Sequence, residues 1–403
     1  VDAIHPGYGF LSENPEFAQA CADAGILFVG PKPAVMRTLG NKVAARNAAV
    51  AAGVPVMPAT PALPKDIEAA KKLAAEVGYP LMLKASWGGG GRGMRVIETE
   101  ADLPAQIEVA RREALAAFGN DEVYLEKLVR RARHVEVQLL GDQHGELVHL
   151  FERDCSVQRR NQKVVERAPA PYLNEASRQE LCEAALRLGR AVNYTHAGTV
   201  EFLMDADTGK FYFIEVNPRI QVEHTVTEQV TGIDIVKAQI RVSEGKRIGA
   251  DAGVPPQSDI KLNGHALQCR VTTEDPENGF TPDYGRLTVY RSAAGFGVRL
   301  DGGTAYAGAI ITPYYDSLLV KVTAWAPQAD EAIHRMDRAL REFRIRGLST
   351  NLQFLENVIN HPAFIAGGVI TRFIDSPPEL FDFKKRRDRA SRDPAPRRAR
   401  ASL

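Results

Sequence analysis

Three oxygen-bearing side chains recur at short spacing near the middle of the sequence and could hold a hard metal ion. Glu201, Glu215 and Asn217 lie in GTVEFLMDADTGKFYFIEVN, where apolar and polar residues alternate on both sides of the polar turn DADTG. This pattern predicts two strands joined as a hairpin. If Met204 pairs with Lys210, the three side chains share one face. The opposite, core face then carries Val200, Phe202, Tyr212, Ile214 and Val216. Such a donor set suits Mg²⁺; the alternative is a solvated sheet face.

A guanidinium, an amide and a carboxylate follow directly after this hairpin. They belong to Arg219, Gln221 and Glu223 in the segment PRIQVEH. An arginine can bind a planar, carboxylate-like anion through two parallel hydrogen bonds, and a nearby glutamate can act as a base. Taken alone, the cluster is also typical of an exposed surface. Beside a metal-binding hairpin it becomes a candidate reaction centre.

A glycine-rich loop, KASWGGGGRGMR, begins at Lys84 and places Gly88, Gly89, Gly90 and Gly91 in succession. A dinucleotide-binding G-x-G-x-x-G loop opens a helix, whereas MRVIE after this loop alternates like a strand. No Lys-Ser or Lys-Thr follows the last glycine, as a Walker loop requires. We therefore predict a strand, glycine loop and strand that fold over the phosphates of a nucleoside triphosphate. A surface hairpin without a ligand is the alternative.

The surrounding pattern predicts the elements that position these residues. A strand, a helix and a strand over residues 1–4, 14–24 and 26–29 indicate part of a doubly wound α/β unit. Helical spacing continues over 32–52, and four prolines then mark a linker. Further strands are predicted over 81–86, 94–98, 134–140, 147–152, 198–204 and 211–217, with helices over 105–118, 228–244 and 330–342.

Composition limits the class of protein. A chain of 403 residues is long enough for two or three packed units. The formal charge is +1, but residues 384–403 hold nine Lys or Arg and two Asp. Residues 1–383 are therefore mildly acidic and lack the excess of basic residues that is typical of nucleic-acid-binding proteins. We expect the basic tail to be disordered. The four widely spaced cysteines indicate a reducing compartment, and no apolar run is long enough to span a membrane.

Several long motifs resemble one family, the biotin carboxylase domain of biotin-dependent carboxylases. They are HPGYGFLSEN, GNKVAAR, KASWGGGGRGMR, RHVEVQ, ERDCSVQRRNQKVVE, FIEVNPRIQVEHTVTE and PYYDSLLVK, in this order, and the likeness runs from residue 1 to about 391. The resemblance implies an α/β (α+β) chain with an ATP-grasp fold. It also implies five segments: 1–29 as the remnant of an N-terminally truncated Rossmann-like preATP-grasp domain, 30–56 as a helical linker, 57–128 as the ATP-grasp lid, 129–383 as the ATP-grasp and biotin carboxylase C-terminal domain, and 384–403 as the tail.

The resemblance also assigns roles to individual residues. The ATP-binding set it implies is Lys42, Lys84, Gly88, Gly89, Gly90, Gly91, Glu126, Lys127, Val129, His134, Gln158 and Glu201. Bicarbonate would contact Lys163, Arg219, Gln221 and Val222, while Glu223 would take its proton. Arg270 would stabilise the enolate form of biotin, with Tyr8 near the biotin ring. Glu201, Glu215 and Asn217 would hold Mg²⁺ or Mn²⁺. Of these residues, Arg219, Glu223, Arg270 and Lys163 would be catalytic.

Within the family the chain looks most like the pyruvate carboxylases, on the basis of Trp87, Asn161 and the segment FIDSPPELFDFKKRRDRA. The implied activity is carboxylation of biotin with ATP and bicarbonate, the first half-reaction of such a ligase. The implied partners are a biotin carrier domain and a carboxyltransferase domain outside this chain, and a second copy in a homo-oligomer. The expected location is the bacterial cytoplasm, or the mitochondrial matrix in a eukaryote. The alternatives are a biotin carboxylase subunit of an acyl-CoA carboxylase and an inactive ATP-binding fragment.

Overall fold

A computed structural model gives the fold and describes residues 1–86, 94–303, 305–375 and 377–383. Its centre is an antiparallel sheet of eight strands in the order β10-β9-β6-β7-β8-β11-β18-β16. These strands are β6 (Ala132–Gly141), β7 (Leu147–Arg159), β8 (Gln162–Ala168), β9 (His196–Asp205), β10 (Phe211–Asn217), β11 (His265–Thr272), β16 (Val298–Gly302) and β18 (Leu318–Ala326). One continuous sheet therefore brings residues from the middle and the end of the chain together.

Helices cover this sheet and build its cores. The helices α2 (Pro33–Gly40) and α3 (Lys42–Ala51) pack against β10, and α6 (Glu175–Ala191) packs against β6 and β7. Together with the sheet they bury residues such as Leu181, Phe202 and Val216. A second core lies between β7 and α8 (Ile235–Ser243). The sequence pattern did not single out α6, although Asn174 caps its first turn by accepting from the amide of Ser177.

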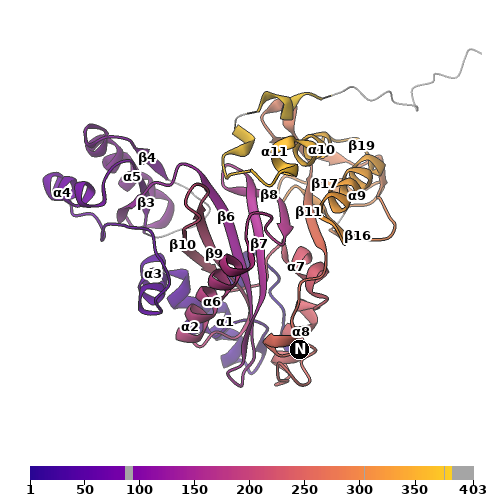
Figure 1. Ribbon diagram of the computed structural model, residues 1–403, viewed down its shortest axis with the longest axis horizontal. Helices are drawn as coiled ribbons and strands as arrows, with labels where there is room; N and C mark the ends of the chain where they lie inside the picture. Colours follow the sequence, from indigo (N-terminus) through magenta and orange to yellow (C-terminus); the bar gives the residue numbers. More distant parts are fainter. Residues whose placement is uncertain (87–93, 304, 376, 384–403) are drawn as a thin grey trace, which may run out of the picture.

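A smaller unit forms from the segment that carries the glycine-rich loop. Its sheet has the order β4-β3-β5 and consists of β3 (Leu81–Ala85), β4 (Arg95–Ile97) and β5 (Val123–Lys127), covered by α4 (Ile67–Val77) and α5 (Leu103–Phe118). Because β3 and β4 pair antiparallel, the two predicted strands are confirmed, while residues 87–93 between them lie outside the described residues. This unit lies at one end of the molecule, and α9 (Ala329–Glu342), α10 (Leu352–Asn360) and α11 (Pro362–Ile365) lie at the other (Figure 1).

The first residues form the predicted strand, helix and strand. A parallel pair, β1 (Ala3–Ile4) and β2 (Leu27–Phe28), is connected through α1 (Pro15–Asp23). The single helix predicted over 228–244 is wrong, since α7 (His224–Thr231) and α8 are separate. Gly232 ends α7 in the left-handed region, with φ 72°, and Asp234 caps α8. The region 32–52 also divides into two helices, because Asn41 accepts from the amide of Ala44 and caps α3.

Short strands complete the C-terminal part. They are β12 (Glu274–Asp275) with β13 (Thr281–Pro282), β14 (Gly285–Arg286) with β17 (Ile310–Ile311), and β15 (Val289–Arg291) with β19 (Arg344–Arg346). A core of β11, β18, α9 and α10 residues, including Leu340 and Phe354, lies beside them. All four cysteines are buried and unpaired, as their spacing predicts. Among the described residues, no helix combines the length and apolar character required to cross a bilayer.

Candidate active site

One cleft gathers the predicted site residues. It has a volume of about 1490 Å³, and the described residues predicted to bind or act on substrates all line it. They are Tyr8, Lys42, Lys84, Glu126, Lys127, Val129, His134, Gln158, Lys163, Glu201, Glu215, Asn217, Arg219, Gln221, Val222, Glu223 and Arg270. Gly88 to Gly91 lie outside the described residues. The continuous sheet explains the convergence, because β6, β8, β9, β10 and β11 are neighbours or near neighbours in it.

The hairpin reaches the predicted arrangement by a different register. Met204 pairs with Phe211 and not with Lys210, and the ladder shifts between Phe213 and Glu215. This β-bulge leaves Ile214 unpaired and places Glu215 directly opposite Glu201. The prediction that Tyr212 and Ile214 lie on the core face is wrong, since both are only half-buried and neither belongs to the apolar core beside β9 and β10. The core positions of β10 before the bulge are instead Phe211 and Phe213.

Glu201 is the meeting point of several side chains. Its Oε1 accepts from Lys163 Nζ at 2.8 Å, from Asn217 Nδ2 at 2.8 Å and from Gln221 Nε2 at 2.9 Å. Its Oε2 lies 3.1 Å from His134 Nε2. Burial raises the pKa of Glu201, but Lys163 and then His134 outweigh it and hold this pKa well below the ordinary value. Glu201 is therefore ionised at neutral pH.

Lys163 sits among three carboxylates. Its Nζ lies 2.5 Å from Glu136 Oε2 and 2.6 Å from Glu223 Oε1, in addition to Glu201. Burial lowers the pKa of Lys163, but the three carboxylates raise it well above its ordinary value. The lysine is thus a fixed positive charge. Lys163 Nζ also lies among the carboxylate oxygens of Glu136 and its acidic neighbours, which are atoms that could bind a metal ion. A metal ion at that position would have to displace Lys163.

Arg270 joins the same network from β11. Its Nε donates to Glu166 Oε1 at 2.7 Å, and its Nη2 donates to Glu223 Oε2 at 2.9 Å. Glu223 is consequently held by two cations, one on each carboxylate oxygen. Although burial raises the pKa of Glu223, Lys163 and Arg270 lower it far below its ordinary value. Glu223 is therefore ionised at neutral pH in this arrangement.

A fully buried arginine, Arg153, holds several side chains of this network in place. Arg153 is 0% exposed, and five side chains accept its N–H groups at 2.6 to 3.1 Å: Glu136, Gln138, Thr199, Gln221 and Thr227. These partners come from β6, β9, α7 and the loop before α7. Every guanidinium donor is therefore used. Arg153 fixes both Glu136, which holds Lys163, and Gln221, which holds Glu201.

Arg219 occupies the rim of the cleft in this structure. Its Nε donates to Glu13 Oε1 at 2.7 Å, and its Nη2 donates to Asn217 Oδ1 at 3.0 Å. Its Nη1 also donates to the Ile220 carbonyl at 3.2 Å, so the structure brings Arg219 to the predicted cleft with its guanidinium bonded to three neighbours. An anion that binds Arg219 through two hydrogen bonds would compete with Glu13.

The residues predicted to bind ATP form a second group. Lys84 forms a close ion pair with Glu126 across the small sheet, and Lys127 Nζ donates to the carbonyls of Gly78 and Tyr79 at 2.8 Å. On the large sheet, Gln158 Nε2 lies 2.8 Å from His134 Nδ1. The predicted ATP-binding residues therefore come from both sheets, which face the same cleft.

A divalent cation fits the acidic side of the cleft. The buried network contains the carboxylates of Glu136, Glu166, Glu201 and Glu223 against the cations Arg153, Lys163 and Arg270. Burial and then the Glu201 charge raise the pKa of Glu215, whose cationic neighbour Lys42 is 3.9 Å away. An undercompensated carboxylate beside Glu201 and Asn217 is the environment that an oxygen-liganded cation stabilises.

Comparison with known proteins decides the family. Residues 41–250 match the family described as "Carbamoyl-phosphate synthase L chain, ATP binding domain", and residues 1–36 and 268–376 match the biotin carboxylase N-terminal and C-terminal domains. The biotin carboxylase domain of Hydrogenobacter thermophilus 2-oxoglutarate carboxylase is 44% identical, with a TM-score of 0.90 over 96% of this chain and 83% of that chain. That structure was solved with MgADP and bicarbonate. The chain belongs to the biotin carboxylase family.

This biotin carboxylase is also similar to longer enzymes. It is 54% identical to Bacillus subtilis pyruvate carboxylase over 97% of its own length and 34% of that protein. It superposes on Rhizobium etli pyruvate carboxylase with a TM-score of 0.91 and 72% identity, again over 97% of this chain and 34% of that one. The chain thus spans about a third of the pyruvate carboxylases that it matches.

Sequence reasoning missed three charged residues of the biotin carboxylase site: Glu136, Arg153 and Glu166. Each of the three is 0% exposed and lies in the middle of a strand. The available signal was a charge between apolar neighbours, as in Val135-Glu136-Val137, because a buried charge requires a partner. The partners, however, come from other strands and could not be named from spacing.

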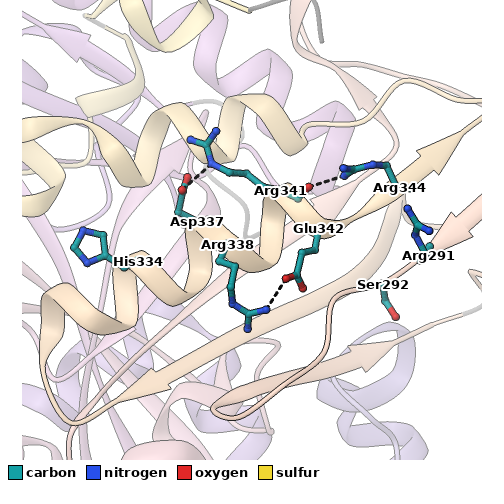
Figure 2. A pocket seen from close by; sticks show the side chains of 8 residues that line it. All are labelled: Arg291, Ser292, His334, Asp337, Arg338, Arg341, Glu342 and Arg344. Carbon is teal, nitrogen blue, oxygen red and sulfur yellow. Dashed lines mark hydrogen bonds and ion pairs between the residues drawn. The ribbon is translucent and has the colours of Figure 1, made fainter. Parts of the chain in front are cut away.

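A second hollow is lined by residues of α9 together with Arg291, Ser292 and Arg344 (Figure 2), and it shares no lining residue with this cleft. Its charged groups largely satisfy one another. Arg338 Nη1 lies 2.7 Å from Glu342 Oε1, Arg341 Nε lies 2.7 Å from Asp337 Oδ2, and Arg344 donates to the Arg341 carbonyl. None of the predicted site residues lines it. The chemistry of the chain is therefore assigned to the larger cleft.

Proposed function

We propose that this biotin carboxylase uses ATP and bicarbonate to carboxylate biotin, as the first half-reaction of a pyruvate carboxylase. The observation that supports it best is the contact of Glu223 with both Lys163 and Arg270. This carboxylate joins the residues proposed for bicarbonate to the arginine proposed for biotin. The membership of the family and the similarity to pyruvate carboxylases point to the same reaction.

The reaction begins with activation of bicarbonate, which is a poor electrophile. A bicarbonate oxygen attacks the γ-phosphorus of ATP, the bond to the β–γ bridging oxygen breaks, and ADP and carboxyphosphate form. Carboxyphosphate then separates into CO₂ and phosphate. The released phosphate takes the ureido proton of biotin, and a bond forms between that nitrogen and CO₂. Water would destroy carboxyphosphate, so this sequence requires a closed cleft.

Protein charges control each step. Lys163, Arg219, Gln221 and the backbone at Val222 would hold bicarbonate. When bicarbonate oxygens compete for Lys163, Glu223 loses part of the positive charge that lowers its pKa. Glu223 is then a stronger base and can accept the bicarbonate proton. Bicarbonate binding itself would thus make Glu223 basic enough to accept the proton.

The nucleotide and its metal ion would occupy the other half of the cleft. Lys42 and Lys84 would contact the phosphates, while Glu126, Lys127, Val129, His134 and Gln158 would line the rest of the ATP site. Glu201, Glu215 and Asn217 would hold Mg²⁺ or Mn²⁺, with the oxygen of Asn217 released from Arg219. When bound, the ion neutralises charge on phosphate oxygens of ATP. The neighbouring lysines add to that neutralisation.

Biotin would enter between Arg270 and Tyr8. Arg270 contacts Glu166 and Glu223 through Nε and Nη2, and no described residue accepts from its Nη1. This free nitrogen can donate to the ureido oxygen as negative charge develops there. Tyr8 lies on the same side of the cleft, beside Lys321. The pair therefore supplies one charged and one aromatic contact.

Because the relatives are about three times longer, we propose that the complete enzyme has further domains. A biotin carrier domain would bring biotin to this cleft, and a carboxyltransferase domain would pass the carboxyl group to pyruvate. The enzyme would act as a homo-oligomer, in the cytoplasm of a bacterium or in the mitochondrial matrix of a eukaryote.

The decisive test measures ADP release from the purified chain with ATP and Mg²⁺. We expect release that requires both bicarbonate and free biotin. Nucleotide binding without this turnover would instead identify an ATP-binding module. Omitting bicarbonate and biotin one at a time distinguishes the proposed reaction from simple ATP hydrolysis.

A further inference from the structure

The loop between β10 and α7 has two successive carbonyl groups held by side chains from outside it. The oxygen of Gln221 accepts from His224 Nδ1 at 2.6 Å, and the oxygen of Val222 accepts from Lys321 Nζ at 3.1 Å. Because a carbonyl only accepts, His224 carries its proton on Nδ1. Both carbonyl contacts therefore have a fixed donor.

These contacts determine where the following amides point. In a planar trans peptide, the C=O and the next N–H point in opposite directions. Holding the Gln221 and Val222 oxygens toward His224 and Lys321 turns the N–H groups of Val222 and Glu223 the other way. Within the part of the chain that the structure describes, neither N–H has an acceptor. Both residues line the cleft.

Lys321 is an unusual residue for its position. It lies in the middle of β18, is 4% exposed, and stands directly between Arg270 of β11 and Asp301 of β16 in the sheet. No carboxylate of the described residues lies within ion-pair distance of it, and burial lowers its pKa. Its hydrogen bond is to the Val222 carbonyl, and its Nζ lies 5.5 Å from the centre of the Tyr8 ring. Burying a cation whose one hydrogen-bond partner is a carbonyl costs free energy, which indicates that Lys321 has a role at this position.

We propose that Lys321 and His224 are positioning residues that aim the amide N–H groups of Val222 and Glu223 at the substrate oxyanion. This inference rests on the proposed function, since the anion is the bicarbonate of that reaction. Two adjacent amides aimed at one point form a concave anion site. Because the amides are fixed before the anion arrives, binding requires no reorganisation of the backbone.

The test compares Lys321→Met, Lys321→Arg, His224→Leu and His224→Asn by steady-state ADP release with free biotin. Methionine keeps the length of the lysine side chain but removes its donor, and we expect the KM for bicarbonate to rise about tenfold. The KM for ATP should change by less than about twofold, because the nucleotide contacts are elsewhere. Asparagine places a donor near the position of Nδ1, so His224→Asn should retain most of the affinity that His224→Leu loses. Lys237→Met, on the exposed face of α8, is the matched control.

The outcomes separate the inference from the proposed function. An unchanged KM for bicarbonate in Lys321→Met and His224→Leu would overturn the inference, as would an equal rise in both KM values, which indicates only structural damage. No bicarbonate-dependent ADP release from the unmodified chain would overturn the proposed function and with it the anion role of this loop. Thermal unfolding of each variant, with and without nucleotide, shows whether the fold is retained.

Discussion

Glu215 lies directly opposite Glu201 across the β9–β10 pair, although a regular ladder continuing from Phe213 and Phe202 would place Glu215 opposite Val200. The extra residue at Ile214 produces this arrangement. Without the bulge, the Glu215 carboxylate would point into the apolar core that Val200 and Phe202 share. The proposed metal site therefore depends on one irregularity of the backbone.

Glu215→Gln tests the metal assignment. Removing this charge should weaken Mg²⁺-dependent nucleotide binding by at least the roughly 10- to 100-fold expected for losing a partner of a bound metal. Stability without ligand should stay the same or rise, since burial and Glu201 disfavour the ionised form of Glu215 and raise its pKa. Titration calorimetry with ADP at several Mg²⁺ concentrations gives the affinity. The exposed Glu244→Gln is the control, and full Mg²⁺ dependence in Glu215→Gln would contradict the assignment.

Arg153→Met tests the buried support of the site. This variant leaves Glu136 without its arginine and removes the donors of four other side chains, so we expect a loss of about 3–5 kcal/mol in the free energy of unfolding. Urea denaturation monitored by circular dichroism measures it. Arg112→Met, whose side chain is 72% exposed, should change stability by less than about 0.5 kcal/mol. Equal stabilities of the two variants would show that the network contributes little.

Arg219→Ala and Glu223→Gln test the reaction centre. Each should abolish bicarbonate-dependent ADP release while the fold is retained, because Arg219 positions the anion and Glu223 accepts its proton. Nucleotide affinity should remain within about threefold of the original, since neither belongs to the proposed ATP site. Activity assays and calorimetry on the same samples provide both values. Full activity in either variant is incompatible with the assigned role.

Three largely buried histidines predict how stability depends on pH. The pKa values of His149, His196 and His224 are lowered to about 4, by burial in all three and by the additional charge of His5 beside His196 and of Lys321 beside His224. Between pH 6.5 and 4, the unfolded chain binds these protons and the folded chain does not. Stability should therefore fall as the pH falls through this window, by up to about 1.4 kcal/mol per pH unit for each histidine.

Urea unfolding at pH 7, 6 and 5 measures this dependence. Replacing His149 with glutamine should flatten the curve, because glutamine does not titrate. A stability that stays constant from pH 7 to pH 5 would show that these groups remain exposed to protons in the folded state.

Residue types and their spacing along the chain were enough to predict the candidate site residues. The spacing of Glu201, Glu215 and Asn217 and the cluster from Arg219 to Glu223 identified side chains that line one cleft, since local alternation and residue chemistry are both written in the chain. The β3–β4 hairpin was predictable for the same reason. The register of β9 and β10 was not, because an extra residue in a strand is decided by packing on both faces.

The pairing of the buried charges could not be predicted from the sequence, because it depends on the tertiary structure. Lys163 meets Glu136, Glu201 and Glu223 across three strands and a loop, and Arg153 joins residues up to 74 positions away. Such partners depend on strand order, which brings β8 beside β11 and β6 between β9 and β7. Strand order minimises the free energy of the whole sheet and its cores, so no local stretch of sequence encodes it.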